Sequence, residues 1–377
     1  MEFDELAGWL RLVATPQVGN TTARRLLSAF GLPERIFAAS PKALAGVAMP
    51  AQVQALAGEP PGFAALLQAT WDWLGAESGE HRIWTLADPD YPLALLQTDD
   101  PPLLLHGAGR CLSGGNPFAW PGQGVAIVGS RNPTPQGAIN AREFARSLAQ
   151  SGWTVVSGLA LGVDGAAHDG ALGGAPPDQL ATIAVVGTGL DRVYPRRHLA
   201  LAHRIAERGL LVSEFPLGTP PLSQNFPMRN RIISALSQGT LVVEAALKSG
   251  SLITARQAVE QGRDVFAIPG SIHSPQSRGC HALIKQGAKL VETAQDVLDE
   301  LAPSTSAAAS AAGQTAALPS EADEVLVALG YDPASLDALI GRSGLPAAKL
   351  QARLLELELE GHVARLPGGL FQRIGAG

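Results

Sequence analysis

The sequence predicts an α/β protein with a mostly parallel central sheet, a helical region before it, and a small domain of three helices and a β-wing after it. Between residues 125 and 301, short apolar runs alternate with segments of helical periodicity. Residues 302–320 are small and polar, which is typical of a flexible linker, and a new hydrophobic pattern follows them. A chain of 377 residues with 46% apolar content has room for two to four domains of roughly 100–200 residues each.

The central region consists of βαβ units, which form parallel sheets through right-handed crossovers. We predict a Rossmann-like sheet, because each apolar strand is followed by a helical segment of about ten residues. The fingerprint G-x-G-x-x-G does not follow the first strand and G-x-x-x-x-G-K-[ST] does not occur, so we expect no NAD or P-loop ATP chemistry and no cofactor. The expected strands are 125–128, 153–157, 181–186, 210–213, 240–243 and 264–268, and the expected helices are 138–150, 164–172, 198–208, 230–237, 254–261, 281–286 and 293–301.

Residues 1–110 are predicted to form an N-terminal helical domain and a connector, with a helix at 60–75 and a strand at 83–86. The first 31 residues resemble a helix-hairpin-helix (SAM-like) element, in which free helix amides can bind a DNA phosphate. Residues 1–124 carry 7 Lys and Arg against 12 Asp and Glu, a net charge of −5. We therefore expect this domain to pack or to contact protein, with Arg24 and Arg25 solvated.

The C-terminal residues 321–377 have the layout of a winged helix, with helices at 321–330, 335–341 and 346–360 and a small β-wing. Its would-be recognition helix ends in Glu356, Glu358 and Glu360, which a phosphate backbone would repel. We interpret this domain as an interaction module or a weak regulator of a basic site elsewhere. The expected domains are thus 1–110, the Rossmann-like domain 111–301, the linker 302–320 and the winged helix 321–377.

The central region is the only one of the three with a positive charge balance. Residues 125–300 hold 16 Lys and Arg against 14 Asp and Glu, whereas residues 301–377 hold 5 against 8. The acidic start is unlike a signal peptide, and no apolar run approaches the roughly 18 residues of a membrane span. Cys111 and Cys280 are isolated, which suits a reducing compartment. We expect a cytoplasmic protein that does not bind membranes.

Five polar segments are expected to meet at one edge of the sheet. Strand 125–128 leads directly into Gly129, Ser130 and Arg131, and in an open parallel sheet the carboxyl ends of the strands are where ligands bind. The segments 157–164 and 186–191 are rich in glycine, which allows a ligand to approach the backbone closely. The other two segments, 226–231 and 248–254, add an aromatic ring, cations, hydroxyls and free helix amides.

A ligand suited to these groups is a polyanion with flat bases. Cations and amides would bind successive phosphates, and Phe226, unless it belongs to the core, would stack on a base for about 1–3 kcal/mol without sequence preference. We therefore predict binding of single-stranded nucleic acid. The candidate binding residues are Ser130, Arg131, Gly158, Phe226, Arg229, Asn230, Arg231, Lys248, Ser249, Gly250 and Ser251.

Several polar residues are expected to be structural. Arg229 and Arg231 flank Asn230 on a helix and cannot point the same way, so we expect Arg231 in the pocket and Arg229 paired with an acid. Glu244 is expected to be the partner of such an arginine. No second group of potential metal ligands accompanies His168 and Asp169, so no metal site is predicted. His168 is expected on a helix face. His273 and His281 are expected to be structural or on the surface.

Five motifs resemble those of the DNA-processing protein A (DprA/Smf) family. They are GSR at 129–131, SGLALGVDGAAH at 157–168, FPMRNRIISALS at 226–237, LKSGSLITARQA at 247–258 and FAIPGS at 266–271. The resemblance implies a homodimer that binds and protects single-stranded DNA during natural transformation and helps to load the RecA recombinase. It also implies a DNA pocket lined by Ser130, Arg131, Phe226, Arg231 and Lys248, with amides from the loop at Gly250.

Two positions depart from the family pattern. Relatives often have a basic residue where this chain has Leu161, and some carry a lysine near 223–224, where this chain has Ser and Gln. The affinity of one protomer is therefore expected to be lower, and dimerisation to matter more. We expect the dimer to use apolar surface within residues 230–295.

Two other classes of function remain open from the sequence. The chain could be an enzyme that hydrolyses a nucleoside monophosphate, with Asp164 or Glu244 as the acid–base group. However, the loops offer more cations than one phosphate needs and no nucleophile–base pair, so we predict that the protein is not an enzyme. It could also be a structural adaptor that acts through its acidic terminal domains.

Overall fold

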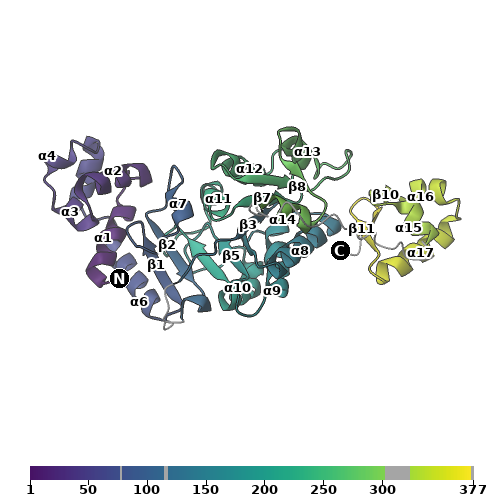
Figure 1. Cartoon of the computed structure of the whole chain (residues 1–377), viewed down its shortest axis with the longest axis horizontal. Coiled ribbons are helices and arrows are strands. Elements are labelled where there is room, and N and C mark those ends of the chain that lie inside the picture. The colour runs from purple at the N-terminus through teal and green to yellow at the C-terminus, as the bar shows by residue number, and fades with distance from the viewer. Residues whose placement is uncertain (77–78, 114–117, 302–322, 375–377) are drawn as a thin grey trace.

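The computed structural model describes residues 1–76, 79–113, 118–301 and 323–374. The described residues form a layered α/β unit, a group of N-terminal helices beside it, and a small C-terminal unit (Figure 1). Within this part of the chain, no helix has the length and apolarity that a membrane span requires.

Within the described residues, the central sheet contains nine strands in the order β1-β2-β6-β5-β4-β3-β7-β8-β9. Strands β3 to β9 pair in parallel, whereas β1 and β2 are antiparallel to each other and β2 is antiparallel to β6. This confirms the prediction of a mostly parallel, Rossmann-like sheet. The strands are β1 (His81–Thr85), β2 (Leu104–Ala108), β3 (Gly124–Val128), β4 (Thr154–Ser157), β5 (Thr182–Val185), β6 (Leu210–Ser213), β7 (Gly239–Val242), β8 (Asp264–Ala267) and β9 (Lys289–Leu290).

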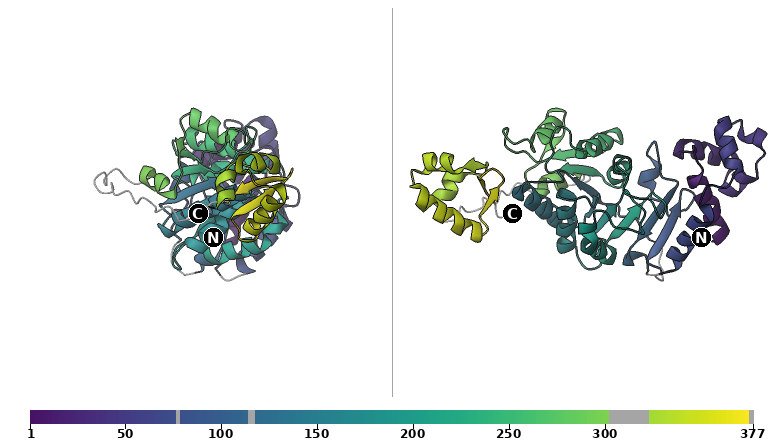
Figure 2. Two further views of the ribbon diagram at one scale, coloured as in Figure 1. Left: turned by 90° about the vertical axis from the view of Figure 1, so that its right-hand side faces the viewer. Right: turned by 180° about the vertical axis from the view of Figure 1, so that it is seen from behind.

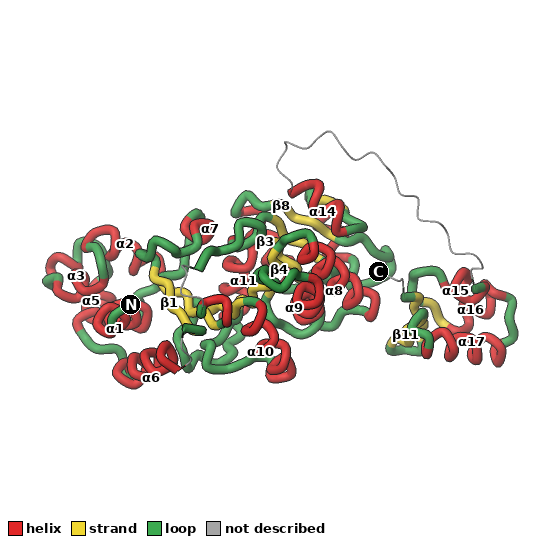
Figure 3. Tube along the Cα trace, turned by 60° about the horizontal axis from the view of Figure 1, so that its bottom comes forward, coloured by secondary structure: helices red, strands yellow, loops and turns green. Residues whose placement is uncertain are grey.

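Helices cover both faces of this sheet, which is why its central strands read as uninterrupted apolar runs. The strands lie between the two helical layers in Figure 1, and Figure 3 colours the helices and strands of the same fold differently. One face packs against α8 (Pro135–Gln150), α9 (Val163–Gly174), α10 (Leu199–Arg208) and α14 (Ala294–Leu301). The other face packs against α7 (Leu93–Leu96), α11 (Asn225–Ala235), α12 (Ser251–Glu260) and α13 (Arg278–Lys285).

The N-terminal helices gather at the end of the sheet formed by β1 and β2 (Figures 1 and 2). The predicted strand at 83–86 is confirmed as β1, and with β2 it extends the central sheet. The sheet thus begins before residue 111, although the expected domain boundary itself stays a prediction. The helices are α1 (Phe3–Ala14), α2 (Asn20–Phe30), α3 (Pro33–Ala38), α4 (Pro41–Leu44), α5 (Pro50–Ala57) and α6 (Phe63–Ala76).

The C-terminal unit has its own apolar core, which includes Leu339, Leu350, Leu354 and Phe371. Its elements are α15 (Glu324–Leu329), β10 (Ala334–Ser335), α16 (Leu336–Ser343), α17 (Ala347–Leu359), β11 (Val363–Leu366) and β12 (Leu370–Arg373), with the strands in the order β10-β12-β11. Three helices followed by a β-wing are the predicted winged helix. The predicted linker at 302–320 lies outside the described residues.

The strand order creates a topological switch point between β3 and β7. From β3 the chain continues through β4, β5 and β6 on one side, and then returns to add β7, β8 and β9 on the other side. Loops that leave the carboxyl ends of β3 and β7 therefore diverge to opposite faces of the sheet and leave a crevice between them, where ligands bind in open α/β sheets.

Candidate nucleic-acid interface

The loop between β3 and α8 forms one wall of this crevice. Ser130 is buried, its Oγ accepts a hydrogen bond from the amide of Asn132 (3.1 Å), and its carbonyl accepts one from Val163 (3.1 Å). The side chain of Arg131, in contrast, is exposed, and its guanidinium lies 5.7 Å from the centre of the Phe226 ring. A rigid loop thus presents a cation beside an aromatic ring.

The loop between β4 and α9 lies directly behind the Arg131 loop. Gly162 has φ +83°, and a methyl group there would approach the carbonyl carbon of Arg131 to 2.7 Å. The carboxylate of Asp164 accepts hydrogen bonds from the amides of Gly158 (3.2 Å) and Ala160 (3.3 Å). Burial raises the pKa of Asp164, while Arg229 and these amides oppose the shift. Asp164 therefore fixes the loop.

Helix α11 supplies Phe226, Arg229 and Asn230. The Arg229 side chain is 4% exposed and donates hydrogen bonds to the carbonyl oxygens of Gly158 (2.7 Å) and Val185. Burial lowers its pKa to about 10, so the guanidinium stays charged at neutral pH. Arg229 ties α11 to the ends of β4 and β5, and its charge contributes to the potential of the crevice.

The amino end of α12 forms the opposite wall. Lys248 is exposed, the hydroxyls of Ser249 and Ser251 are 2.7 Å apart, and Gly250 is the N-cap residue. The helix dipole places a partial positive charge at this end of α12, which suits an anion. The amides of Leu252 and Ile253 already donate hydrogen bonds to the carbonyls of Ser249 (3.2 Å) and Gly250 (3.1 Å). Lys248 forms no ion pair within the described part of the chain.

These walls enclose a pocket of about 490 Å³. Of the described residues that line it, three are cations (Arg131, Arg229 and Lys248) and one is a carboxylate (Asp164), a balance that favours anions. Gly158 lies behind the wall: a methyl group there would be 2.5 Å from Arg229 Nη2 and 2.7 Å from Asp164 Oδ2. The candidate residues that line the pocket are Ser130, Arg131, Phe226, Arg229, Asn230, Lys248, Ser249, Gly250 and Ser251.

The prediction for the two arginines of α11 was wrong. Arg231, expected in the pocket, is not on its wall; its guanidinium pairs with Glu214 (2.5 Å) and Asp100 (3.3 Å) and is 12% exposed. Arg229 lines the pocket beside Asp164, whose charge opposes the lowering of the Arg229 pKa by burial, but its hydrogen bonds go to carbonyl oxygens. The two arginines diverge as expected, but it is Arg229 and not Arg231 that reaches the pocket.

The prediction that Glu244 is the partner of an arginine was also wrong. Its carboxylate accepts hydrogen bonds from the amide (2.9 Å) and the hydroxyl (2.6 Å) of Thr134, the N-cap residue of α8. Glu244 therefore connects the end of β7 to the start of α8. His168 is buried on α9 and bonds to Thr182 (2.7 Å), as expected of a structural residue.

Sequence reasoning missed some residues of the pocket. Gln276 lines it and donates a hydrogen bond to the carbonyl of Asn132 (3.1 Å), and Ser223 and Thr254 also contribute. Gln276 comes from the segment after β8, whose carboxyl end reaches the same edge of the sheet. That position is the only signal in the sequence that could have indicated it.

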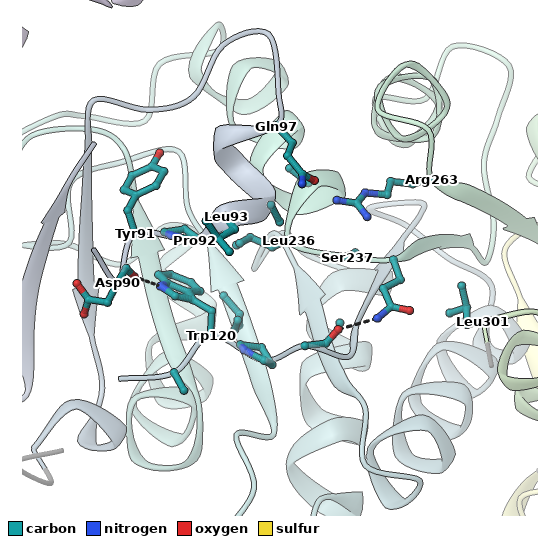
Figure 4. Close-up of a pocket in the computed structure, with 18 of the residues that line it drawn as sticks. Asp90, Tyr91, Pro92, Leu93, Gln97, Trp120, Leu236, Ser237, Arg263 and Leu301 are labelled. Carbon is teal, nitrogen blue, oxygen red and sulfur yellow. Dashed lines mark hydrogen bonds between the residues drawn. The ribbon is translucent and has the colours of Figure 1, made fainter. Parts of the chain in front are cut away.

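A larger pocket, of about 750 Å³, lies at the amino ends of β3 and β8 (Figure 4). There the indole of Trp120 donates a hydrogen bond to the carbonyl of Asp90 (3.0 Å), beside Tyr91 and Leu236. Its described lining contains one cation, Arg263, and three carboxylates. This charge balance does not suit a polyanion, so we place the candidate site at the carboxyl edge.

Comparisons with known proteins agree with this fold. The family model of DNA recombination-mediator protein A matches residues 82–302, and that of the DprA winged helix domain matches residues 307–369. The chain is 44% identical to Protein Smf of Escherichia coli over 313 residues, which is 80% of each chain. It is also 46% identical to DNA processing protein DprA of Streptococcus pneumoniae over 229 residues, 60% of this chain and 77% of that one.

Comparison with solved structures also finds similarity to DNA processing protein A. The crystal structure of DprA from Streptococcus pneumoniae superposes with a TM-score of 0.63 at 35% identity and covers 80% of this chain and 98% of that one. DNA processing protein A from Helicobacter pylori, described as binding single-stranded DNA, gives a TM-score of 0.50 at 32% identity over 58% of this chain and 95% of that one. With a family model matching more than half of its length, this chain belongs to the DNA recombination-mediator protein A (DprA) family.

Proposed function

We propose that this protein binds single-stranded DNA without sequence preference at the carboxyl edge of its central sheet. The observation that carries the proposal is the convergence of Arg131, Lys248 and the amino end of α12 on one crevice, where Phe226 lies beside Arg131. Successive phosphates would contact the two cations and the positive amino end of α12, and bases would stack on Phe226. The DprA relative from Helicobacter pylori is described as binding the same ligand, which supports this assignment.

The test is fluorescence anisotropy of a labelled oligo-dT over a series of salt concentrations. For single strands, the slope of log K against log salt is about −0.7 per phosphate contact, so Arg131→Ala should weaken binding and make the slope shallower by about 0.7. Arg35→Ala, which removes an exposed cation from α3, is the matched control and should bind like the wild type. Binding indifferent to Arg131 would move the DNA away from this crevice.

An enzymatic role is not favoured. Asp164 is committed to the amides of Gly158 and Ala160, and Glu244 to Thr134, so neither carboxylate is free to serve as an acid–base group. Incubation with nucleoside monophosphates should release no free base, and release that depends on Asp164 would restore the hydrolase alternative.

We further propose that the protein is a homodimer that uses apolar surface within residues 230–295. Leu247, Val259 and Ile272 are between 58% and 74% exposed, and a pocket of about 510 Å³ beside α12 is lined by Leu247, Leu252 and Val259. Sedimentation equilibrium at micromolar concentration should show a dimer, and Val259→Glu should shift it to monomer. Leu93→Glu, which alters an equally exposed leucine on α7, should leave the dimer intact.

The proposed place of action is the cytoplasm during natural transformation, where the protein would protect incoming DNA and help to load RecA. Both Cys111 and Cys280 are free thiols, which suits a reducing compartment. RecA ATPase activity on single-stranded DNA already covered by a single-strand binding protein should rise when this protein is added. The Arg131→Ala variant should give a smaller rise, because it binds the DNA more weakly.

A further inference from the structure

An exposed tyrosine lies next to the stacking residue of the proposed DNA pocket. The rings of Tyr194 and Phe226 have centroids 5.6 Å apart and are tilted by 34°. Tyr194 is 47% exposed, whereas Phe226 is half-buried, and Tyr194 is not part of the pocket wall. The loop after β5 therefore places a second aromatic surface just outside the pocket.

Two unpaired cations follow this tyrosine. Arg196 and Arg197 are exposed in the 3₁₀ turn η2 (Arg196–His198) that leads into α10, and within the described residues neither forms a hydrogen bond through its side chain or an ion pair. The acid of this loop, Asp191, is already neutralised by Arg192 (2.6 Å) and also accepts a hydrogen bond from the amide of Gly218 (2.8 Å). Arg196 and Arg197 thus give the loop an uncompensated positive charge.

The segment is fixed to the same edge of the sheet as the pocket. His198 Nδ1 hydrogen-bonds with the carbonyl of Leu159 (3.0 Å), in the loop that follows β4 and precedes Asp164. Its imidazole also packs against Gly165 closely enough that a methyl group there would lie 2.6 Å from Cε1. Tyr194 and the two arginines are therefore held in a defined position relative to Phe226.

We propose that Tyr194, Arg196 and Arg197 form a second contact for single-stranded DNA, which continues the strand's path from the pocket past Phe226 toward the start of α10. This inference rests on the proposed function of the pocket. The chemistry is that of non-specific single-strand binding: Tyr194 supplies a face for a base, and each arginine contacts a phosphate. The pocket then binds the first nucleotides, and this surface, defined by Tyr194, Arg196 and Arg197, binds those that follow.

The experiment compares oligo-dT of about 6 nucleotides, short enough for the pocket alone, with oligo-dT of about 20 nucleotides. With the long strand, Arg196→Ala/Arg197→Ala should make the salt slope shallower by about 1.4, because two phosphate contacts are lost. Tyr194→Ala should lower the affinity for the long strand about 5-fold to 150-fold, and Tyr194→Phe should bind the long strand as tightly as the wild type. With the short strand, the double arginine variant should bind like the wild type.

The matched control is Arg35→Ala/Lys42→Ala, which removes two exposed cations from α3 and α4 and should leave both slopes unchanged. The inference is overturned if the double arginine variant has the same slope as this control on the long strand. It is also overturned if Tyr194→Ala weakens both lengths equally while the arginines have no effect, because Tyr194 would then only support Phe226. In either case Arg131→Ala still reports on the pocket. The proposed function itself would be refuted if the wild type bound neither strand, or if its binding did not depend on Arg131.

Discussion

Gly162 allows the β4–α9 loop to pack closely behind the Arg131 wall of the crevice. It has a positive φ that L side chains rarely adopt, and its α-carbon faces the backbone of Ser130 and Arg131. Gly162→Ala should destabilise the protein by roughly 1–3 kcal/mol and weaken oligo-dT binding, because the Arg131 loop must move. Urea unfolding and anisotropy would measure the two effects.

Gly173 provides the matched control on the same helix. A methyl group there meets nothing within 4 Å, so Gly173→Ala should leave binding unchanged and stabilise the protein by up to about 1 kcal/mol. If Gly162→Ala and Gly173→Ala had the same stability and the same affinity for oligo-dT, the role given to Gly162 would be contradicted.

Buried histidines make stability depend on pH. Burial lowers the pKa of His106 to about 4 and that of His168 to about 3. Below their ordinary pKa of about 6.5, the unfolded chain binds protons that the folded protein does not, so the free energy of unfolding falls as the pH falls. Between about pH 6.5 and pH 5 the two groups should together remove about 3 kcal/mol.

His168→Asn should remove about half of this dependence, as measured by urea unfolding at each pH. His273→Asn, at an exposed position, is the control and should leave the dependence unchanged. If the wild type and His168→Asn lose stability in parallel, His168 is not the group responsible.

Helix α11 is anchored to the end of β6 by a buried ion pair. Arg231 and Glu214 have side chains that are 12% and 8% exposed, and Asp100, which also pairs with Arg24 of α2, joins them. Arg231→Met should cost roughly 3–5 kcal/mol, because Glu214 is left buried without a partner. Thermal or urea unfolding would measure this loss.

Replacing both partners should recover most of that stability, so Arg231→Met/Glu214→Leu is the informative second variant. Arg192→Met breaks the more exposed pair with Asp191 and should cost less than about 1 kcal/mol. A loss of that size for Arg231→Met would mean that the α11 pair is not a tertiary anchor.

The helices and strands of the central region could be predicted because their signal is local. An apolar run such as 125–128 and the helical periodicity after it are visible within one short window, and the order of β and α elements then implies a parallel sheet. The meeting of the loops at Arg131, Phe226 and Lys248 follows from the same topology, since the carboxyl ends of parallel strands share an edge.

Side-chain partners could not be predicted, because they come from distant parts of the chain. Helical periodicity separates Arg229 from Arg231, but which of them faces the pocket depends on Glu214 and Asp100. Asp100 precedes Arg231 by 131 positions, and no pattern in the sequence links them. The same holds for Glu244 and Thr134, which lie 110 positions apart.

For the whole molecule, the structure separates the proposed DNA-binding unit from the winged helix. In the winged helix, Arg353 pairs with Asp323, Glu356 and Glu360, and Arg365 pairs with Glu358, so these cations are already neutralised. A chain ending at residue 301 should therefore bind oligo-dT within about threefold of the full-length protein. A much larger loss would place DNA on the winged helix and contradict its interpretation as an interaction module.

The pairing of strands that are distant in the sequence also sets the order in which the parts of this protein can fold during synthesis. His106 of β2 lies beside Ser213 of β6, 107 positions later, and β3 must wait for β7 before the switch point exists. Such non-local strand pairs form slowly, and only after much of the chain has been synthesised. A nascent chain released before α12 would display Arg131 but lack the opposite wall. The capacity to hold DNA thus arises late in biosynthesis, as a property of the completed sheet.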